Sequence, residues 1–387
     1  MLFFVITFLL LLPYLLLILY YSRCWNTLPV YIGPKFSARE PLPFISIIIA
    51  ARNEENNIAH CIQSINGQTY PVDKFELIIV NDHSTDNTAG VIKSFSNGNI
   101  HLINLDEFTG NKRLNSYKKK CIETALTFAK GELIITTDAD CTVPPKWVET
   151  IVNYYKKNNA VFIAAPVVFS KAGSQDSFGK RLLIIFQSLD FMTLQGITGA
   201  AVSHKMHNMC NGANLAYTKK AFEEVNGFEG IDNIASGDDM LLMNKIQKRF
   251  PNQVGFLKSR DAIVKTNAEP TFNKFINQRI RWASKSDKYS DKKITSVLIL
   301  VYLLNVWLFV LGIFSFFALK IFYLFLIALA LKIMIELIFL FPVAKFFDRK
   351  KLLWCFIPAQ PFHILYTIIA GWLGKFGQYK WKGRSVK

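Results

Sequence analysis

The sequence predicts an α/β fold in which a mostly parallel sheet is covered by helices and flanked by transmembrane helices. Two observations predict it. Between about Pro43 and Asp287, short apolar runs alternate with amphipathic helical stretches, and this alternation is typical of a parallel sheet. Both ends of the 387-residue chain carry long apolar runs, and 51% of all residues are hydrophobic. We therefore expect one soluble domain between membrane-embedded segments.

The N-terminal segment reads as a membrane anchor. Residues Leu2 to Tyr21 form an apolar run about one bilayer long. No Lys or Arg precedes this run, and no small-residue cleavage site follows it. We therefore expect residues 1–22 to be an anchor that is retained, rather than a signal peptide that is removed.

The C-terminal region, residues 294–373, is also predicted to lie in the membrane. Ile294 to Leu319 and Ile321 to Phe341 are two apolar runs separated by little more than Lys320. Each run is long enough to cross a bilayer, so the pair predicts a tight helical hairpin.

A third apolar stretch, Leu352 to Leu373, is interrupted by Pro358 and Pro361. It could be a kinked span, a re-entrant segment or a helix lying in the interface. If the soluble domain is cytoplasmic, the basic residues 345–351 fall inside, whereas the basic tail 374–387 would fall outside after a complete crossing. The positive-inside rule therefore favours a last segment that does not cross.

Charge and cysteine content exclude several classes of function. The net charge is +17, yet we find no basic helix or interleaved aromatic array typical of a nucleic-acid-binding module. Anionic lipid headgroups and a phosphorylated substrate explain the charge better. The cysteines lack CxxC spacing, so the sequence indicates neither a zinc site nor a disulfide framework.

The soluble region contains short runs rich in β-branched residues and bounded by polar turns. The predicted strands are residues 44–50, 75–81, 99–105, 132–137 and 160–168. Helices are expected to begin near Glu54, Asp86 and Ser116. In such a sheet, ligands bind beyond the carboxyl ends of the strands.

Polar side chains follow three of these strands. Asn53 follows the first, Asp82 and Asp86 follow the second, and Asp138 and Asp140 end the fourth. Taken singly, the residues after the first two strands could simply cap helices. The two aspartates of "DAD" precede a Pro-Pro turn instead, and two like charges so close require a cation. A divalent metal, Mg²⁺ or Mn²⁺, is the candidate.

The sequence lacks both a Walker-type phosphate loop and a GxGxxG motif. A bound diphosphate would therefore need other cations. A metal at Asp140 would bridge it, and the run Lys118, Lys119 and Lys120 at the front of a helix could add point charges. The alternative for these lysines is a solvated helix face.

Five motifs occur in a fixed order: "SIIIAARNEENNI", "IIVNDHSTDNT", "DAD", "SGDDMLL" (Ser236 to Leu242) and "QRIRW" (Gln278 to Trp282). In this order, and followed at once by apolar spans, they resemble the family 2 glycosyltransferases. The resemblance covers about Pro43 to Trp282. It is specifically to the membrane-bound branch related to cellulose, chitin and hyaluronan synthases and to ceramide glucosyltransferases. It implies a GT-A-like, nucleotide-diphospho-sugar transferase fold.

This sequence departs from the family pattern in two places. Asn81 stands where the family often has the first of two aspartates, and only Asp82 keeps a carboxylate. The usual Glu-Asp of the acceptor-side motif is Asp238-Asp239. By resemblance, Asp239 takes the role of general base, with Asp238 beside it; the alternative is a helix N-cap, and both can hold.

The resemblance also implies the remaining site residues. The nucleotide would contact Asn53, Glu54 and Asp82. Asp140 would hold the metal, with Asp138 at the ribose or in the outer shell of the metal. In the "QRIRW" motif, Arg281 would be a fixed cation on the diphosphate, and Gln278 and Trp282 would close over the acceptor side.

Three further features have two interpretations each. Cys210 to Tyr217 places small residues beside the donor sugar, by resemblance, or is a Gly turn into a strand. His204 and His207 could be ligands, but without nearby acids they are better explained as a loop feature. Lys332 and Glu336 lie one helical turn apart, so they pair with each other or contact a lipid headgroup.

Together these inferences predict a metal-dependent, inverting hexosyltransferase in the inner (plasma) membrane, with its catalytic domain in the cytoplasm. The donor would be a nucleotide-sugar, with uracil as the base by resemblance, and the acceptor a membrane lipid. A processive polysaccharide synthase acting on a glycan is the alternative, although few spans are present to form a channel. A membrane subunit that only binds sugar nucleotides would not need Asp138, Asp140, Asp239 and Arg281 together.

Overall fold

A computed structural model of the chain describes residues 1–34, 41–95, 98–110, 114–234, 237–285, 291–377, 379–381 and 384–386. The chain forms two compact units, and neither is continuous in sequence. The helical unit comprises Met1–Leu28, Lys171–His207 and Ala268–Lys387. The sheet unit comprises Pro29–Ser170 and Asn208–Asn267.

These units divide the chain differently from the predicted catalytic domain, residues 43–287. The predicted domain includes residues 171–207 and 268–287. In the structure, both of these segments belong to the helical unit. Asp287 itself, like Ser236 of the "SGDDMLL" motif, lies outside the described residues.

The sheet unit is built on a seven-stranded sheet, counted over the described residues, with the order β3-β2-β1-β4-β7-β5-β8. Its strands are β1 (Ile45–Ala51), β2 (Phe75–Asn81), β3 (Ile100–Asn104), β4 (Leu133–Asp138), β5 (Phe162–Ala164), β7 (Leu215–Thr218) and β8 (Val254–Phe256). Strands β3, β2, β1 and β4 run parallel, β7 is antiparallel to both neighbours, and β8 is parallel to β5. The prediction of a mostly parallel sheet is confirmed.

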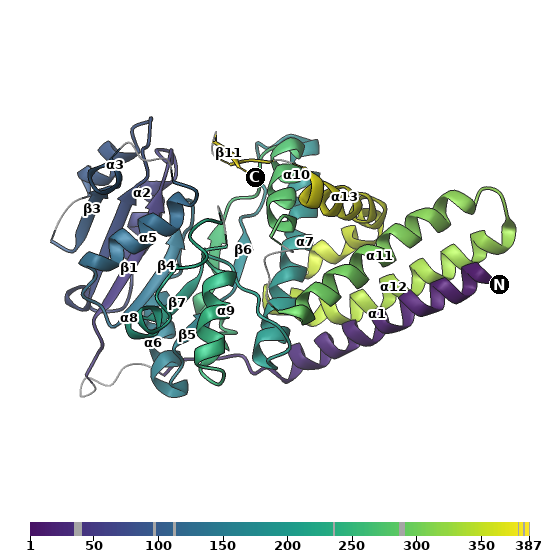
Figure 1. Cartoon of the computed structure of the whole chain (residues 1–387), viewed down its shortest axis with the longest axis horizontal. Coiled ribbons are helices and arrows are strands. Elements are labelled where there is room, and N and C mark those ends of the chain that lie inside the picture. Colours follow the sequence, from purple (N-terminus) through teal and green to yellow (C-terminus); the bar gives the residue numbers. More distant parts are fainter. Residues whose placement is uncertain are drawn as a thin grey trace. The chain divides into compact units, whose positions relative to one another are not determined.

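Successive residues of β1 and β2 are buried rather than alternate ones, so both faces of the sheet are covered. The covering elements lie between the strands in sequence (Figure 1). They are α2 (Ile58–Asn66), η1 (Val72–Lys74), α3 (Thr88–Ser94), α4 (Asp106–Thr109), α5 (Tyr117–Phe128), α6 (Trp147–Asn158), α8 (Lys219–Glu224), α9 (Met240–Arg249) and η2 (Arg260–Ala262). The helices expected near Glu54, Asp86 and Ser116 are α2, α3 and α5.

One predicted strand is wrong in detail. Residues 160–168 do not form a single strand but two short ones, β5 and β6 (Val167–Phe169), with Pro166 between them. Proline has no backbone N–H to give to a ladder, so the chain leaves the main sheet there. Strand β6 pairs instead with β9 (Val264–Thr266) in a second, two-stranded sheet.

The helical unit contains five helical segments that are long and apolar enough to cross a membrane, judged by length and composition over the described residues. They are α1 (Leu2–Thr27), α7 (Phe178–Ser203), α11 (Lys292–Phe314), α12 (Leu319–Phe346) and the segment Lys350–Phe376, which comprises η4 (Lys350–Cys355) and α13 (Phe356–Phe376). The unit also contains α10 (Phe272–Ala283) and a hairpin of β10 (Tyr379–Trp381) and β11 (Arg384–Val386). Figure 1 shows α1, α11 and α12 side by side.

Helix α7 was not predicted from the sequence. The most apolar 18-residue stretch of α7 has a mean hydropathy of 1.3, against 2.9 for that of α1, because α7 includes polar residues such as Gln187 and Asp190. Of the residues in this stretch, 61% are buried within the protein, a larger share than in the other candidate spans. Its polar residues therefore face protein rather than solvent or lipid.

The C-terminal hairpin differs slightly from expectation. The connection between α11 and α12 is residues 315–318, and Lys320 lies inside α12. The last segment is not broken by its prolines, because Pro358 lies in the first turn of α13 and the helix continues through Pro361. Whether this segment crosses the membrane stays a prediction.

A buried polar cluster holds α1, α12 and α13 together. Lys332 pairs with Glu336 at 2.8 Å and donates to the Oε1 atom of Gln360 at 2.8 Å. The hydroxyl of Tyr14 donates to Glu336, and Gln360 donates to the same carboxylate at 3.2 Å. Lys332 is fully buried, so its charge is balanced inside the unit, in agreement with self-pairing of these residues.

Candidate active site in the sheet unit

The two aspartates of "DAD" lie at the carboxyl end of β4. Asp138 is the last residue of the strand, and the chain turns at Ala139 and Asp140. The backbone of Thr142 pairs with Lys265 of β9, which brings Thr266 beside the turn. The Thr266 hydroxyl donates to Asp140 Oδ2 at 3.1 Å. The second sheet thus fixes the orientation of the Asp140 carboxylate.

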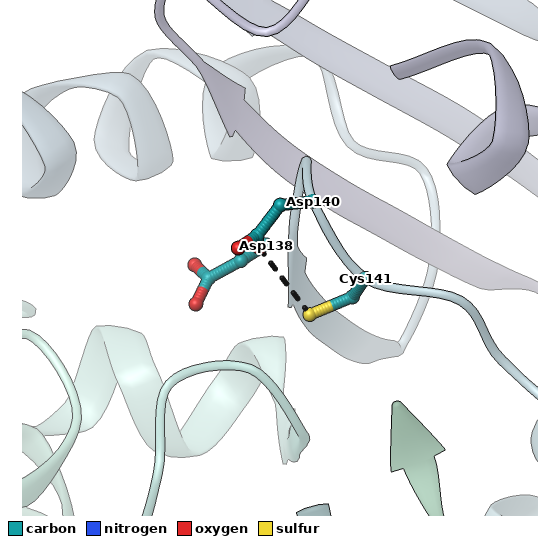
Figure 2. Close-up of side chains that lie close together, drawn as sticks. All are labelled: Asp138, Asp140 and Cys141. Atoms are coloured by element: carbon teal, nitrogen blue, oxygen red, sulfur yellow. Dashed lines mark hydrogen bonds between the residues drawn. The ribbon is translucent and has the colours of Figure 1, made fainter. Parts of the chain in front are cut away.

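Asp138, Asp140 and Cys141 lie close enough to share a metal ion (Figure 2). One ligand atom from each falls within 4.8 Å of the others, and the Cys141 thiol donates to Asp140 Oδ1 at 3.7 Å. Burial, followed by the charges of the two aspartates, raises the pKa of the Cys141 thiol. The carboxylates of Asp138 and Asp140 supply the oxygen ligands of this group. Such a donor set fits Mg²⁺ or Mn²⁺.

A lysine links this turn to the second carboxylate motif. Lys118 Nζ, from the first turn of α5, lies 2.7 Å from Asp138 Oδ1 and 3.1 Å from Asp238 Oδ2. Burial alone would lower the pKa of Lys118, but the attraction of Asp138, Asp238 and Asp239 outweighs it, so the pKa is well above its ordinary value. Lys118 is therefore charged, and it neutralises two carboxylates that would otherwise repel each other.

The second motif begins α9. Gly237 has a φ of +81°, a left-handed conformation that glycine adopts without strain, and the chain turns there into the helix. Asp239 is the N-cap: its Oδ1 accepts from Met240 N at 2.7 Å, and its Oδ2 accepts from Gly212 N at 3.1 Å. Both interpretations of this residue, a helix cap and a positioned carboxylate, are therefore compatible.

Gly212, from the "CNGANLAY" stretch, lies against the same residues. A Cβ atom there would be 3.0 Å from Lys118 Nζ, 3.2 Å from Asp238 Oδ2 and 3.7 Å from Asp239 Cβ. Only a residue without a side chain leaves this group of charges undisturbed. We call Lys118, Asp138, Asp140, Asp238 and Asp239 the carboxylate cluster.

Lys119 does not belong to this cluster, and its predicted role as a phosphate contact stays a prediction. Its side chain is buried, and Nζ donates to the carbonyls of Ile231 and Ile234 at 2.5 and 2.7 Å. On a helix, successive residues point about 100° apart, so Lys118 faces the carboxylates while Lys119 holds the loop that precedes Asp238.

The loops after β1 and β2 are cross-linked by their predicted site residues. Asn53 Oδ1 accepts from Thr85 N at 2.8 Å, and Asp86 Oδ1 accepts from Thr88 N at 3.0 Å. The Glu54 carboxylate accepts from Asn57 Nδ2 at 2.8 Å. Burial would raise the pKa of Asp86, but hydrogen bonds to its carboxylate outweigh burial and lower that pKa. The N-caps of α2 and α3 are Asn57 and Asn87, so Asp86 accepts from the first residue of α3 without being its N-cap.

Asp82 is buried at the end of β2 and is paired with two cationic or ionisable neighbours. His83 Nδ1 lies 3.0 Å from Asp82 Oδ1, and Arg52 Nη1 lies 3.8 Å from the same atom. Arg52 also donates to the Asp82 carbonyl at 2.8 Å. Asn81, in place of the usual aspartate, donates to Asn104 Oδ1 at 3.1 Å and accepts from Ser84 N at 3.2 Å. Its amide is therefore engaged within this loop.

The residues of "QRIRW" lie on α10 in the helical unit. Gln278 donates to Glu269 Oε1 at 3.1 Å and accepts from Arg279 Nη1 at 2.7 Å. The guanidinium of Arg279 lies 4.2 Å from the ring centroid of Trp282. Arg281 is half-exposed. The structure thus groups Gln278 and Trp282 through Arg279, while the carboxylate cluster belongs to the sheet unit.

Four residues of these sites were missed by the sequence reasoning. Arg52 directly precedes Asn53, and a cation at a strand end was a usable signal. Gly212 lies in a stretch that had been noted, but its contacts could not be inferred. Thr266 contacts Asp140, and Arg279 pairs with Asp190 of α7. Both partners lie far along the chain, so no spacing in the sequence indicates these contacts.

Comparison with known proteins agrees with this geometry. Residues 46–225 match the family described as Glycosyl transferase family 2. The glycosyltransferase AglE of Haloferax volcanii is 30% identical over 131 residues, which are 33% of this chain and 41% of that protein. The beta-monoglucosyldiacylglycerol synthase of a Nostoc species is 26% identical over 164 residues, 42% of this chain and 34% of that protein. The chain spans less than half the length of these curated relatives.

A solved structure also shares the fold. The mannosyltransferase PcManGT from Pyrobaculum calidifontis, in complex with GDP-Man and Mn²⁺, aligns with a TM-score of 0.56 and 18% sequence identity. The alignment covers 96% of this chain and 98% of that one. This similarity confirms the predicted GT-A-like fold. The chain is therefore similar in sequence to the family 2 glycosyltransferases over residues 46–225, and it has a GT-A-like fold.

Proposed function

We propose that this protein is an inverting glycosyltransferase that moves a sugar from a nucleotide-sugar to a membrane lipid. The observation that carries the proposal is the carboxylate cluster, in which Lys118 joins the end of β4 to the start of α9 within a family 2 domain. Five helical segments suited to a membrane, and a relative named beta-monoglucosyldiacylglycerol synthase, support a lipid acceptor.

The donor diphosphate would bind at the carboxyl end of β4. Asp140, with Asp138, would hold Mg²⁺ or Mn²⁺, which supplies a Lewis acid for the leaving diphosphate. The structurally similar mannosyltransferase was solved with GDP-Man and Mn²⁺, which supports a divalent metal and a nucleotide-sugar. Asn53, Glu54 and Asp82 would contact the nucleoside, for which we expect uracil as the base.

Two residues of the cluster would balance the charge of the diphosphate and remove the proton of the acceptor hydroxyl. Lys118 is the cation nearest to Asp138, and it could turn to an incoming diphosphate oxygen when a metal takes its place. Asp239 keeps free lone pairs on both carboxylate oxygens after accepting from two backbone amides. It would take the proton of the acceptor hydroxyl as that oxygen bonds to the sugar C1 and the bond from C1 to the diphosphate breaks.

The roles of the α10 residues rest on the family resemblance. Arg281 would be a fixed cation for the diphosphate, and Gln278 and Trp282 would bind on the acceptor side. We place the catalytic residues on the cytoplasmic side of the plasma membrane, where nucleotide-sugars are made.

Transfer by the purified full-length protein tests the proposal. The protein in detergent or nanodiscs would be incubated with Mn²⁺ or Mg²⁺, total membrane lipid and a panel of radiolabelled UDP- and GDP-sugars. Label in the organic phase that is lost with EDTA is the expected result. Label in an aqueous or insoluble polymer would instead indicate a processive polysaccharide synthase. No transfer from any donor would contradict the proposal.

The base assignment is tested by Asp239→Asn, with Asp73→Asn in η1 as a matched control at an exposed aspartate. Loss of a general base typically costs about 10²–10⁴-fold in rate. We expect the Asp239 variant to lose transfer by that factor while its affinity for the nucleotide changes less than about threefold. Transfer at the wild-type rate would refute the assignment.

A further inference from the structure

We propose that Asp190 and Tyr366 are positioning residues that fix Gln278 and Trp282 of the "QRIRW" helix by holding Arg279. Neither residue belongs to a family motif, and each comes from a different helix of the helical unit, α7 and α13. The inference rests on the proposed function in one respect: Gln278 and Trp282 must take part in transfer.

Arg279 is the centre of the arrangement. Its guanidinium is sandwiched between two aromatic rings of the same helix, 4.8 Å from the centroid of Phe275 and 4.2 Å from that of Trp282. These rings lie four residues before and three residues after it, so all three side chains share one face of α10. Arg279 also donates to Gln278 Oε1 at 2.7 Å. The orientation of one guanidinium therefore sets two side chains of the motif.

Asp190 holds that guanidinium from α7. Its Oδ2 lies 2.7 Å from Arg279 Nη2, and the side chains of the pair are 6% and 4% exposed. The Tyr366 hydroxyl, from α13, donates to the other carboxylate oxygen. An apolar group surrounds the pair, with Phe186 from α7, Phe275 from α10 and Tyr366 in contact. Within it, Asp190 and Arg279 have little freedom to change partners.

Stability alone does not account for this arrangement. Burying two charges costs hydration free energy, and the attraction between them often offsets only part of that cost. Well-packed apolar residues in the same place often give a protein of equal or greater stability. In some proteins a buried polar or ionic group selects one geometry rather than adding stability. Here the selected geometry places a flat cation against the Trp282 indole, an interaction that depends on the orientation of both groups.

The helical unit contains a matched control. In the polar cluster of α1, α12 and α13, a buried tyrosine hydroxyl also donates to a buried, ion-paired carboxylate: Tyr14 to Glu336, which pairs with Lys332. Among the described contacts, this second pair makes none with α10. Substitutions at the two sites remove the same chemistry, but only one site holds the motif.

The first experiment compares Asp190→Asn and Tyr366→Phe with Glu336→Gln and Tyr14→Phe. We expect kcat for transfer to fall at least tenfold in Asp190→Asn and about threefold in Tyr366→Phe, with KM for the donor changed less than twofold. The control variants should keep kcat within twofold at a comparable loss of thermal stability. Equal kcat in Asp190→Asn and Glu336→Gln, whether high or low, would overturn the proposal.

A second measurement does not depend on activity. The protein would be labelled with 5-fluorotryptophan, and the ¹⁹F resonance of Trp282 would be assigned by its loss in Trp282→Phe. We expect Asp190→Asn and Tyr366→Phe to shift or broaden this resonance and the control variants to leave it unchanged. An unchanged resonance in both would overturn the positioning role even if the protein transfers a sugar. If the wild type transfers no sugar, the proposed function fails, and the resonance still decides whether Asp190 holds Trp282.

Discussion

Replacing Lys118 by Met removes the cation that joins Asp138 to Asp238 while keeping most of the side-chain volume. A hydrogen bond between charged groups contributes about 1.5–3 kcal/mol. Lys118 makes two such contacts, at 2.7 and 3.1 Å, with side-chain exposures of 21% for Lys118, 36% for Asp138 and 13% for Asp238. Solvent screens the contact with Asp138 most, so we take a total of about 2–3 kcal/mol.

The expected effect is measurable as a lower midpoint of thermal unfolding. For a domain of this size, 1 kcal/mol corresponds to about 2–4 °C, so Lys118→Met should unfold about 4–12 °C below the wild type. The pKa of Lys118 is raised in the folded state, so its contribution is fully present below the ordinary lysine pKa. The difference should therefore be constant from about pH 6 to pH 9.

Lys120→Met is the matched control on the same helix. Lys120 pairs only with Glu123 among the described residues, at 3.3 Å in a largely exposed position, and such pairs contribute less than about 0.5 kcal/mol. Mn²⁺ should raise the midpoint more in Lys118→Met than in the wild type, because the metal no longer competes with an ammonium for Asp138. Equal midpoints in the two lysine variants, or equal Mn²⁺ increments in Lys118→Met and the wild type, would refute this reasoning.

Three further predictions concern other features of the protein. Gly212→Ala should reduce transfer about tenfold through its contact with Lys118, and should change the free energy of unfolding by less than about 1 kcal/mol. A Cβ atom at Gly179 meets no atom within 4 Å, so Gly179→Ala should leave transfer unchanged. Transfer assays on both variants test this prediction. Lys119→Met should lower the free energy of unfolding by about 2–4 kcal/mol, because it leaves two backbone carbonyls without a charged donor. Mn²⁺ should not alter that loss. An unchanged midpoint of thermal unfolding would show that Lys119 does not hold its loop. Burial lowers the pKa of His207 to about 4, so the folded protein favours the neutral imidazole. The free energy of unfolding should therefore fall by up to about 3 kcal/mol between pH 6.5 and pH 4. The unfolding midpoint of His207→Gln should depend less on pH than that of the wild type, and identical pH profiles would contradict this assignment.

The four parallel strands β1 to β4 could be predicted because they are apolar runs that end in polar turns, whereas β8 is only three residues long and gave no such signal. "DAD" and "DDMLL" could be recognised for a similar reason, since each begins or ends an element whose pattern is clear. The bridge by Lys118 could not be predicted, because three adjacent lysines look alike in sequence and only the rotation of α5 separates Lys118 from Lys119.

The helical unit was less predictable. Helix α7 carries Gln187 and Asp190, which lower its hydropathy. Their partners, Glu269 and Arg279, lie 82 and 89 residues further along the chain. Hydropathy counts these residues as polar, although in the folded protein they are buried and paired. The structure divides the chain into two interrupted units, and the predicted catalytic domain, residues 43–287, stays a prediction.

The order in which these segments are synthesised has a consequence for biogenesis. Helix α1 leaves the ribosome first, but its hydrogen-bond partner Glu336 follows Tyr14 by 322 residues. At about 5–20 residues per second, roughly 16–64 s pass before that partner is translated. During this interval the tyrosine hydroxyl lacks its final acceptor, so α1 would need a temporary partner, such as a chaperone. Termination of translation before α12 would leave a chain whose helical unit cannot be completed.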